Sequence, residues 1–174
     1  MKRSMLPLVA FCLSITAFSA VSRAESSPIR IRVEATNKLD PEKTKTTQTR
    51  VLNVTLDNSS AEPQELKVKF AVFGRDVSSR DIVTVGQGEV PVTVKGRGSE
   101  KVQTTEAKAS SDDPKPAANA KGGGKKAEPT GQKIVGHGVQ VFKGDTMVAE
   151  FYEPASMKAS FGTATAVKPA EAKK

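Results

Sequence analysis

The sequence is poor in the side chains that build most catalytic and metal centres. Its 174 residues include one cysteine, one histidine, one tyrosine and no tryptophan. Cys12 has no second cysteine for a disulfide, and His137 has no second histidine with which to bind a metal ion. The acidic residues fall singly on polar strand faces or in loops, so no paired carboxylates indicate acid–base catalysis. We therefore expect a protein that is not an enzyme, with no catalytic residue, cofactor or metal site.

The first 24 residues have the three parts of a secretory signal peptide. Lys2 and Arg3 form the basic start, and residues 5–18 are an apolar run. Ser22 and Ala24 are the small residues expected before a cleavage site. The apolar run is shorter than the roughly 20 residues that a membrane-spanning helix needs. We expect cleavage after Ala24 and export to the periplasm, the outer membrane or the cell exterior; an uncleaved N-terminal anchor is the alternative.

The formal net charge of +8 is distributed unevenly along the chain. Residues 108–133 hold six lysines against three acidic residues, and residues 167–174 hold three lysines against one acidic residue. Once residues 1–24 are set aside, the rest of the chain has basic and acidic residues in equal number. The excess positive charge therefore lies in two polar segments, whereas the remaining body is neutral.

Apolar and polar residues alternate along most of the chain outside these segments. IRIRVEAT from Ile29, VLNVTLDN from Val51 and ELKVKFAV from Glu65 each place their apolar side chains on one face. This period of two is typical of half-buried β-strands. The pattern predicts an all-β fold, an antiparallel immunoglobulin-like β-sandwich of about seven to eight strands, as a single domain over residues 25–166.

A low-complexity insertion interrupts the predicted sandwich before its final hairpin. Its main part, residues 111–133, contains no valine, isoleucine, leucine, methionine or aromatic residue. We expect residues 108–133 to form a flexible, disordered loop and residues 167–174 a disordered basic tail, because neither has the apolar surface that offsets ordering entropy. No aromatic side chains are present there to stack on bases, so no specific nucleic acid is expected. The candidate anion contacts, for an acidic glycan or lipopolysaccharide, are Lys121, Lys125, Lys126 and Lys133.

Three details are predicted for the C-terminal part of the body. Alternating runs on both sides of Lys143-Gly144-Asp145 predict a hairpin with a short turn. Residues 153–162, EPASMKASFG, are expected to make one helical turn. His137 is predicted to be an interior histidine, because it shares its strand face with the neighbouring valines Val135, Val139 and Val141.

The order of these strand patterns resembles that of exported bacterial domains with an immunoglobulin-like or fibronectin-III-like sandwich. The runs that carry the resemblance are VLNVTLDNSS, ELKVKFAVFG and GVQVFKGDTMVAEF. The last run is similar to the final hairpin of small envelope proteins of Gram-negative bacteria, some of which accompany type IV pilus machinery. The chain departs from antibody domains in lacking their cysteine pair and core tryptophan. The resemblance therefore implies a fold and a location, and transfers no functional residue.

These features together predict an exported, non-enzymatic β-sandwich that works by contact. It would be an interaction, adhesion or accessory module of the bacterial cell envelope, with the pilus association that the resemblance implies. Its partner would be another envelope protein or polymer. The alternative is an anion-binding protein that uses the basic insertion and tail to hold an acidic glycan or lipopolysaccharide.

Overall fold

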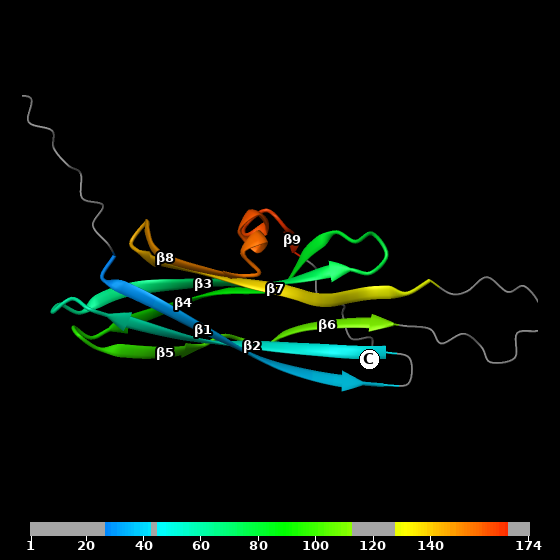
Figure 1. Ribbon diagram of the computed structural model, residues 1–174, viewed down its shortest axis with the longest axis horizontal. Helices are drawn as coiled ribbons and strands as arrows, with labels where there is room; N and C mark the ends of the chain where they lie inside the picture. The colour runs from blue at the N-terminus through cyan, green and yellow to red at the C-terminus, as the bar shows by residue number, and fades with distance from the viewer. Residues whose placement is uncertain (1–26, 43–44, 113–127, 167–174) are drawn as a thin grey trace, which may run out of the picture.

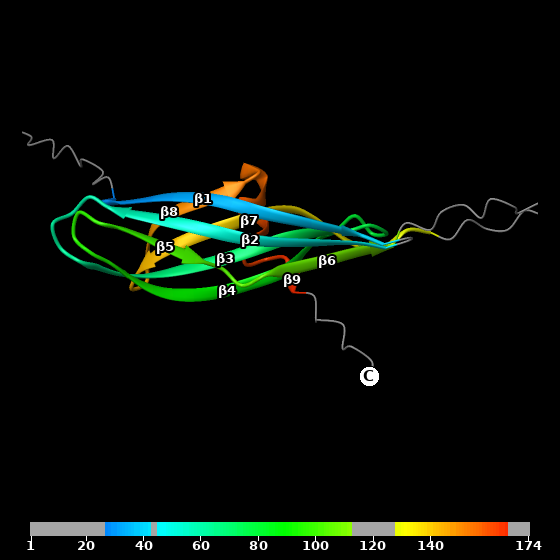
Figure 2. The ribbon, with the colours of Figure 1, turned by 90° about the horizontal axis from the view of Figure 1, so that it is seen from below.

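Two β-sheets packed face to face form the body of the protein (Figures 1 and 2). The computed structural model describes residues 27–42, 45–112 and 128–166. Long strands of 13 or 14 residues give the body its elongated shape. The elements are β1 (Ile29–Pro41), β2 (Lys45–Asn58), β3 (Gln64–Asp76), β4 (Ile82–Val94), β5 (Ser99–Gln103), β6 (Ala107–Asp112), β7 (Thr130–Lys143), β8 (Thr146–Glu153), the 3-10 helix η1 (Ala155–Ser160) and β9 (Thr165–Ala166).

The body is an antiparallel β-sandwich, as predicted, and its strand order is the immunoglobulin-like one. In the first sheet β1 pairs with β2, and β5 and β6 follow one another along the other edge of β2. In the second sheet the order is β8-β7-β3-β4, and the short β9 pairs with β4 in parallel. The chain crosses between the sheets after β2, after β4 and after β6, which makes Greek-key connections. A short pairing of β6 with the start of β7 joins the two sheets at one end.

The break between β5 and β6 is bridged by one buried side chain. Thr104 lies between the two strands and is 5% exposed. Its hydroxyl accepts a hydrogen bond from the Leu52 N–H at 3.0 Å, and its own N–H donates to the Leu52 carbonyl at 2.9 Å. Both backbone groups of Leu52 are therefore satisfied where the ladder is interrupted.

The main hydrophobic core lies between the sheets and follows the predicted alternation. Leu52, Val54 and Leu56 of β2 are fully buried against side chains of the opposite sheet. Each such side chain contributes about 1.5 to 3 kcal/mol relative to an exposed position. The opposite sheet supplies Leu66, Val68, Phe70, Val72, Val139 and Val141.

A second, smaller apolar cluster covers the outer face of the second sheet. Phe73 of β3 is fully buried there beneath Met157 of η1 and the partly buried Phe161. The helical turn predicted for residues 153–162 is thus found as η1, and it serves to cover this face. Gly136 of β7 makes the close approach possible, because a Cβ atom there would lie 2.7 Å from both the Met157 Cγ and the Glu153 carbonyl oxygen.

A β-bulge in β7 corrects one predicted strand face. The register between β3 and β7 shifts after Phe73, and Val135 is the extra residue. Val135 consequently packs with the outer cluster, while its neighbour Ile134 packs against the main core. The prediction that Val135 shares a face with His137 was wrong, because a bulge reverses the parity of every residue beyond it. His137 itself is buried, at 2% exposed, as predicted.

The ends of the predicted insertion are strands. Residues 108–112 belong to β6, and residues 130–133 belong to β7, so the boundaries 108 and 133 were too wide. Small side chains hid this from the sequence pattern, since Ala107, Ala109 and Ser111 are buried without having large apolar groups. The signal-peptide, inner-insertion and tail predictions fall on residues 1–26, 113–127 and 167–174, which lie outside the described residues.

Candidate binding site between the two sheets

The sandwich is open on one side, where β8 is shorter than its neighbours. β8 ends at Glu153, opposite His137 of β7, whereas β1 and β2 continue past this point as a paired hairpin (Figure 1). The inward side chains of β2 change chemistry at the same place, from Leu52 to Arg50 and Gln48. The uncovered part of the interior is therefore polar.

A cavity of about 360 Å³ occupies this open side. It receives side chains from both sheets and from the cis-proline that follows β8. Its lining residues are Ala35, Asn37, Arg50, Val135, His137, Glu153 and Pro154.

Arg50 and His137 form the floor of the cavity. The Arg50 Nε donates to the Asn37 Oδ1 at 2.6 Å, and its Nη1 lies 3.4 Å from the His137 Nδ1. On the other side of the ring, the His137 Nε2 lies 3.7 Å from the Glu153 Oε2. That distance is too long for a hydrogen bond. The Nε2 is buried and has no hydrogen-bond partner among the described residues.

The site disfavours a second positive charge. Burial lowers the pKa of Arg50, and the Glu153 carboxylate partly opposes that effect. The pKa of His137 is also lowered, first by burial and then by the charge of Arg50, while Glu153 acts in the opposite direction. His137 is therefore neutral near pH 7, because its ordinary pKa is about 6.5.

The proton of the neutral imidazole can be placed from its neighbours. A guanidinium group only donates hydrogen bonds, so the His137 Nδ1 beside Arg50 must be the acceptor. The ring proton then lies on Nε2, the atom without a hydrogen-bond partner. Phe151 contacts the ring at a centroid distance of 5.8 Å and helps to hold it in place. The site therefore holds a buried N–H donor, without a hydrogen-bond partner among the described residues, beside a partly buried cation.

A smaller cavity of about 150 Å³ shares Asn37 and Arg50 with the first. At its border Gln48 reaches across to β7, where its Oε1 accepts the Ile134 N–H at 2.7 Å. This bond satisfies a backbone donor of β7 beyond the end of β8. Leu39, which is 59% exposed, also lines the cavity and gives it an apolar rim.

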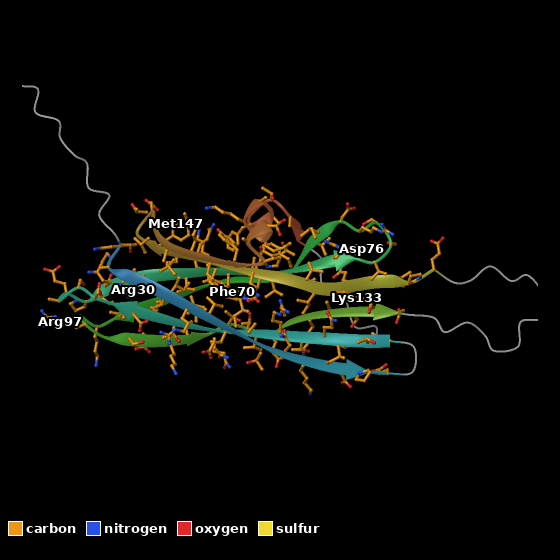
Figure 3. All side chains as sticks on the ribbon, viewed as in Figure 1. Arg30, Phe70, Asp76, Arg97, Lys133 and Met147 are labelled. Carbon is orange, nitrogen blue, oxygen red and sulfur yellow. The ribbon has the colours of Figure 1, made fainter. Side chains whose placement is uncertain are left out.

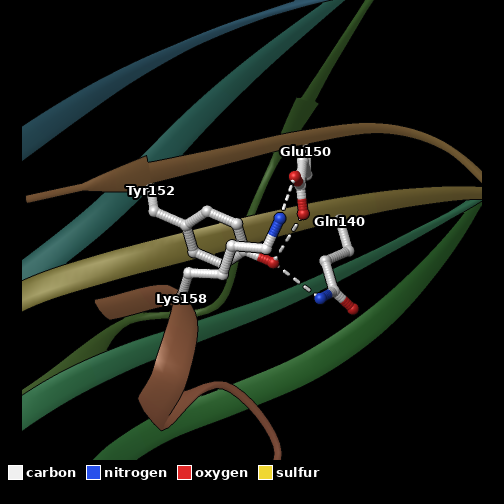
Figure 4. A network of polar contacts seen from close by, with 4 residues as sticks. All are labelled: Gln140, Glu150, Tyr152 and Lys158. Atoms are coloured by element: carbon white, nitrogen blue, oxygen red, sulfur yellow. Dashed lines mark hydrogen bonds and ion pairs between the residues drawn. The ribbon is translucent and has the colours of Figure 1, made fainter. Parts of the chain in front are cut away.

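A second polar cluster, on the outer face of the second sheet, has a structural role (Figure 4). Gln140 donates to the Tyr152 hydroxyl at 2.7 Å, and that hydroxyl donates to Glu150 at 3.2 Å. Lys158 of η1 forms an ion pair with Glu150, which raises the pKa of Lys158 and lowers that of Glu150. These contacts tie η1 to β8 on the outer face of the second sheet.

The predicted anion contacts are not assembled into a site by the described residues. Lys133 lies exposed on β7, opposite Arg75 of β3 in the ladder register (Figure 3). The other three, Lys121, Lys125 and Lys126, lie outside the described residues. The described residues also contain no group of three or more side chains that could hold a metal ion, and no helix among them is long and apolar enough to cross a membrane.

Sequence reasoning missed Arg50 and Glu153 as members of a site. A signal for Arg50 was present, because it lies two residues before Leu52 and so has the parity of the core. A charged residue at an inward position needs a partner or water. Glu153 gave no such signal, since its position beside His137 depends on the register of the β7–β8 hairpin, which shifts between Val141 and Phe142.

The chain has only weak similarity to known proteins. No protein-family model and no curated protein matches it. Among solved structures, it is similar to a β-glucuronidase from glycoside hydrolase family 2, with 12% identity, a TM-score of 0.35, and coverage of 75% of this chain and 11% of that one. It is also similar to a Northeast Structural Genomics Consortium target, with 9% identity, a TM-score of 0.38, and coverage of 86% of this chain and 95% of that one. A third similar structure is a protein from Akkermansia muciniphila, with 17% identity, a TM-score of 0.36, and coverage of 82% of each chain.

The chain thus spans 11% of the β-glucuronidase, and 95% and 82% of the other two proteins. At these TM-scores the likenesses carry no argument about function. The site has to be interpreted from its own residues.

Proposed function

We propose that the protein is an exported, non-enzymatic β-sandwich that binds another macromolecule as an interaction, adhesion or accessory module of the bacterial cell envelope. The observation that carries the proposal is the open side of the sandwich. There the edge strand β1 has no strand partner on its outer side among the described residues, and it lines the cavity with Ala35 and Asn37. An unpaired edge beside a polar cavity is suited to receiving an extended chain.

Export is the part of the proposal that rests on sequence. The basic start, the apolar run and the small residues before Ala24 support it. Fractionation of the producing bacterium, followed by N-terminal sequencing, tests it directly. Recovery from the periplasm or the medium with Glu25 as the first residue is expected, and an intact N-terminus in the inner membrane would contradict it.

Site-specific photo-crosslinking in cells tests the binding role. A photoreactive amino acid at Lys38, on β1 beside the smaller cavity, is expected to yield an adduct of discrete mass. The matched control is the same replacement at Lys101, an exposed lysine on β5 at the other edge of that sheet. Adducts at both positions, or at neither, would contradict a specific contact at the open side.

A further inference from the structure

The cavity at the open side contains more hydrogen-bond donors than acceptors. The bonds of the Arg50 side chain to Asn37 and His137 use only part of the five N–H groups of its guanidinium. Asn37 accepts through its Oδ1, which leaves its NH₂ group as a further donor. The His137 Nε2–H adds a third donor residue, and it comes from a side chain that is 98% buried. These donors could together hydrogen bond to an anionic acceptor.

The only acidic side chain that lines the cavity does not fill this role. The Glu153 side chain is 67% exposed, and its carboxylate stands 3.7 Å from the His137 Nε2. It forms no ion pair with Arg50 within 4 Å among the described residues. Glu153 therefore lies near enough to act electrostatically and too far to hydrogen bond. The His137 Nε2 is covered in the structure. A second carboxylate therefore reaches it only when the Glu153 side chain, which is largely exposed, turns toward solvent.

We infer that this cavity binds a carboxylate group carried by a polypeptide partner, with Arg50 and the His137 Nε2–H as its donors and Glu153 as a competing resident carboxylate. The inference deepens the proposed function, on which it rests for the nature of the partner. A planar carboxylate matches the guanidinium fork, and charge-assisted bonds of this kind are about twice as strong as neutral ones. The neutral state of His137 leaves one fixed donor rather than a second cation.

The surroundings favour a polypeptide as the carrier of the carboxylate. The cavity opens beside the unpaired edge of β1, whose backbone groups can pair with an extended chain. The adjoining cavity and the exposed Leu39 offer a place for an apolar side chain of the same segment. An acidic residue flanked by β-forming apolar residues would therefore fit both cavities.

His137 gives a direct readout of binding, because it is the only histidine in the chain. We suggest titrating the isotope-labelled, tag-free chain, residues 25–174, with the blocked peptide acetyl-Thr-Val-Glu-Val-Thr-amide and following the imidazole and arginine Nε–H signals by NMR. Saturable shifts of the His137 and Arg50 signals are expected. The same peptide with glutamine in place of glutamate should bind about tenfold more weakly, since it loses the charge-assisted pair.

Two variants separate the carboxylate site from general charge effects. Glu153→Gln is expected to bind the acidic peptide several-fold more tightly, because the resident competitor is gone, and a gain of this kind cannot arise from misfolding. Its matched control, Glu100→Gln, removes an exposed charge from β5 and should leave the affinity unchanged. Arg50→Gln should lower the affinity for the acidic peptide at least tenfold. Arg30→Gln, on the outer face of β1, should leave that affinity unchanged.

Three results would overturn the inference: equal binding of the glutamate and glutamine peptides, no gain in Glu153→Gln, or saturation by sodium acetate as readily as by the peptide. The last result would mean that the site takes free carboxylates. If the crosslinking experiment fails and the peptide binds as expected, the proposed binding function in the cell is contradicted and the carboxylate site is supported. If crosslinking succeeds and the peptide does not bind as expected, the carboxylate site is contradicted and the proposed binding function is supported.

Discussion

The two halves of β2 face the same interior with opposite chemistry. Toward the end of β2 that leads into β3, Leu52, Val54 and Leu56 are fully buried in the main core. Toward its start, the inward positions are occupied by Gln48 and Arg50, which are only partly buried. The strand, its pairing with β1 and its alternation are continuous through both halves.

The difference follows from what lies opposite. β8 covers the closed half and ends at Glu153, so the interior beyond that point borders solvent and a cavity. Apolar side chains there would remain exposed, whereas polar ones can reach neighbours, as Gln48 does with the Ile134 N–H. The closed half therefore contains most of the main core, and the open half has polar side chains beside a cavity.

The largest effect is expected from a cavity in the closed half. Leu52→Ala should lower the free energy of unfolding by about 2 to 5 kcal/mol, because Leu52 is fully buried and its neighbours can collapse only partly. The matched control is Leu39→Ala in the open half, where the side chain is 59% exposed and the change should stay within about 0.5 kcal/mol. Urea unfolding measures the free energy of unfolding of both variants. Equal decreases in the two would contradict a difference in stability between the halves.

A smaller loss is expected at the border between the halves. Gly136→Ala would place a Cβ atom 2.7 Å from the Met157 Cγ and from the Glu153 carbonyl oxygen. Overpacking of this kind destabilises by about 1 to 3 kcal/mol. It should also displace the end of β8, so the NMR signals of His137 should change together with the unfolding midpoint. Unchanged stability with unchanged His137 signals would mean that η1 and β8 do not need this close approach.

The closed half was largely predictable from the sequence, and the open half was not. Alternation around Leu52 and Val68 indicates the sandwich, because a period of two with one apolar face requires a second sheet to cover it. The bulge at Val135 leaves no trace in composition, since it is a property of the backbone register. The helical turn predicted from residue 153 indicates where β8 ends, but a further register shift, between Val141 and Phe142, determines that Glu153 lies opposite His137, and alternation does not reveal it.

The burial of His137 predicts that the free energy of unfolding depends on pH. Its pKa is lowered in the folded state by burial and by Arg50, with Glu153 opposing. Well above its ordinary pKa of about 6.5 the histidine is neutral in both states, and it adds no pH dependence. As the pH falls below that value the unfolded chain binds the proton first, so the free energy of unfolding decreases, by at most about 1.4 kcal/mol per pH unit for one proton.

Urea unfolding between pH 7.5 and 5.5 tests this dependence. The His137→Gln variant should lose the slope in this range, because the carboxylates whose pKa values are lowered, such as Asp76 and Glu89, titrate below it. Equal slopes in the variant and the natural chain would show that another group titrates. Addition of the acidic peptide should oppose the loss if the carboxylate site is real, since ligand binding stabilises the folded state.

The smallest effect on stability is expected at the far end of the open half, where residues 113–127 connect β6 to β7. The ladder pair Asp112 and Thr130 brings the two ends of this connection together, so two glycines can replace residues 113–127. Shortening the loop from about 17 to about four residues is two doublings, which should raise the free energy of unfolding by roughly 1.2 kcal/mol. The same change removes Lys121, Lys125 and Lys126 and retains Lys133, so binding to anionic vesicles should weaken at low salt if these lysines are anion contacts. Unchanged vesicle binding would leave the carboxylate cavity between the sheets as the better candidate for anion recognition.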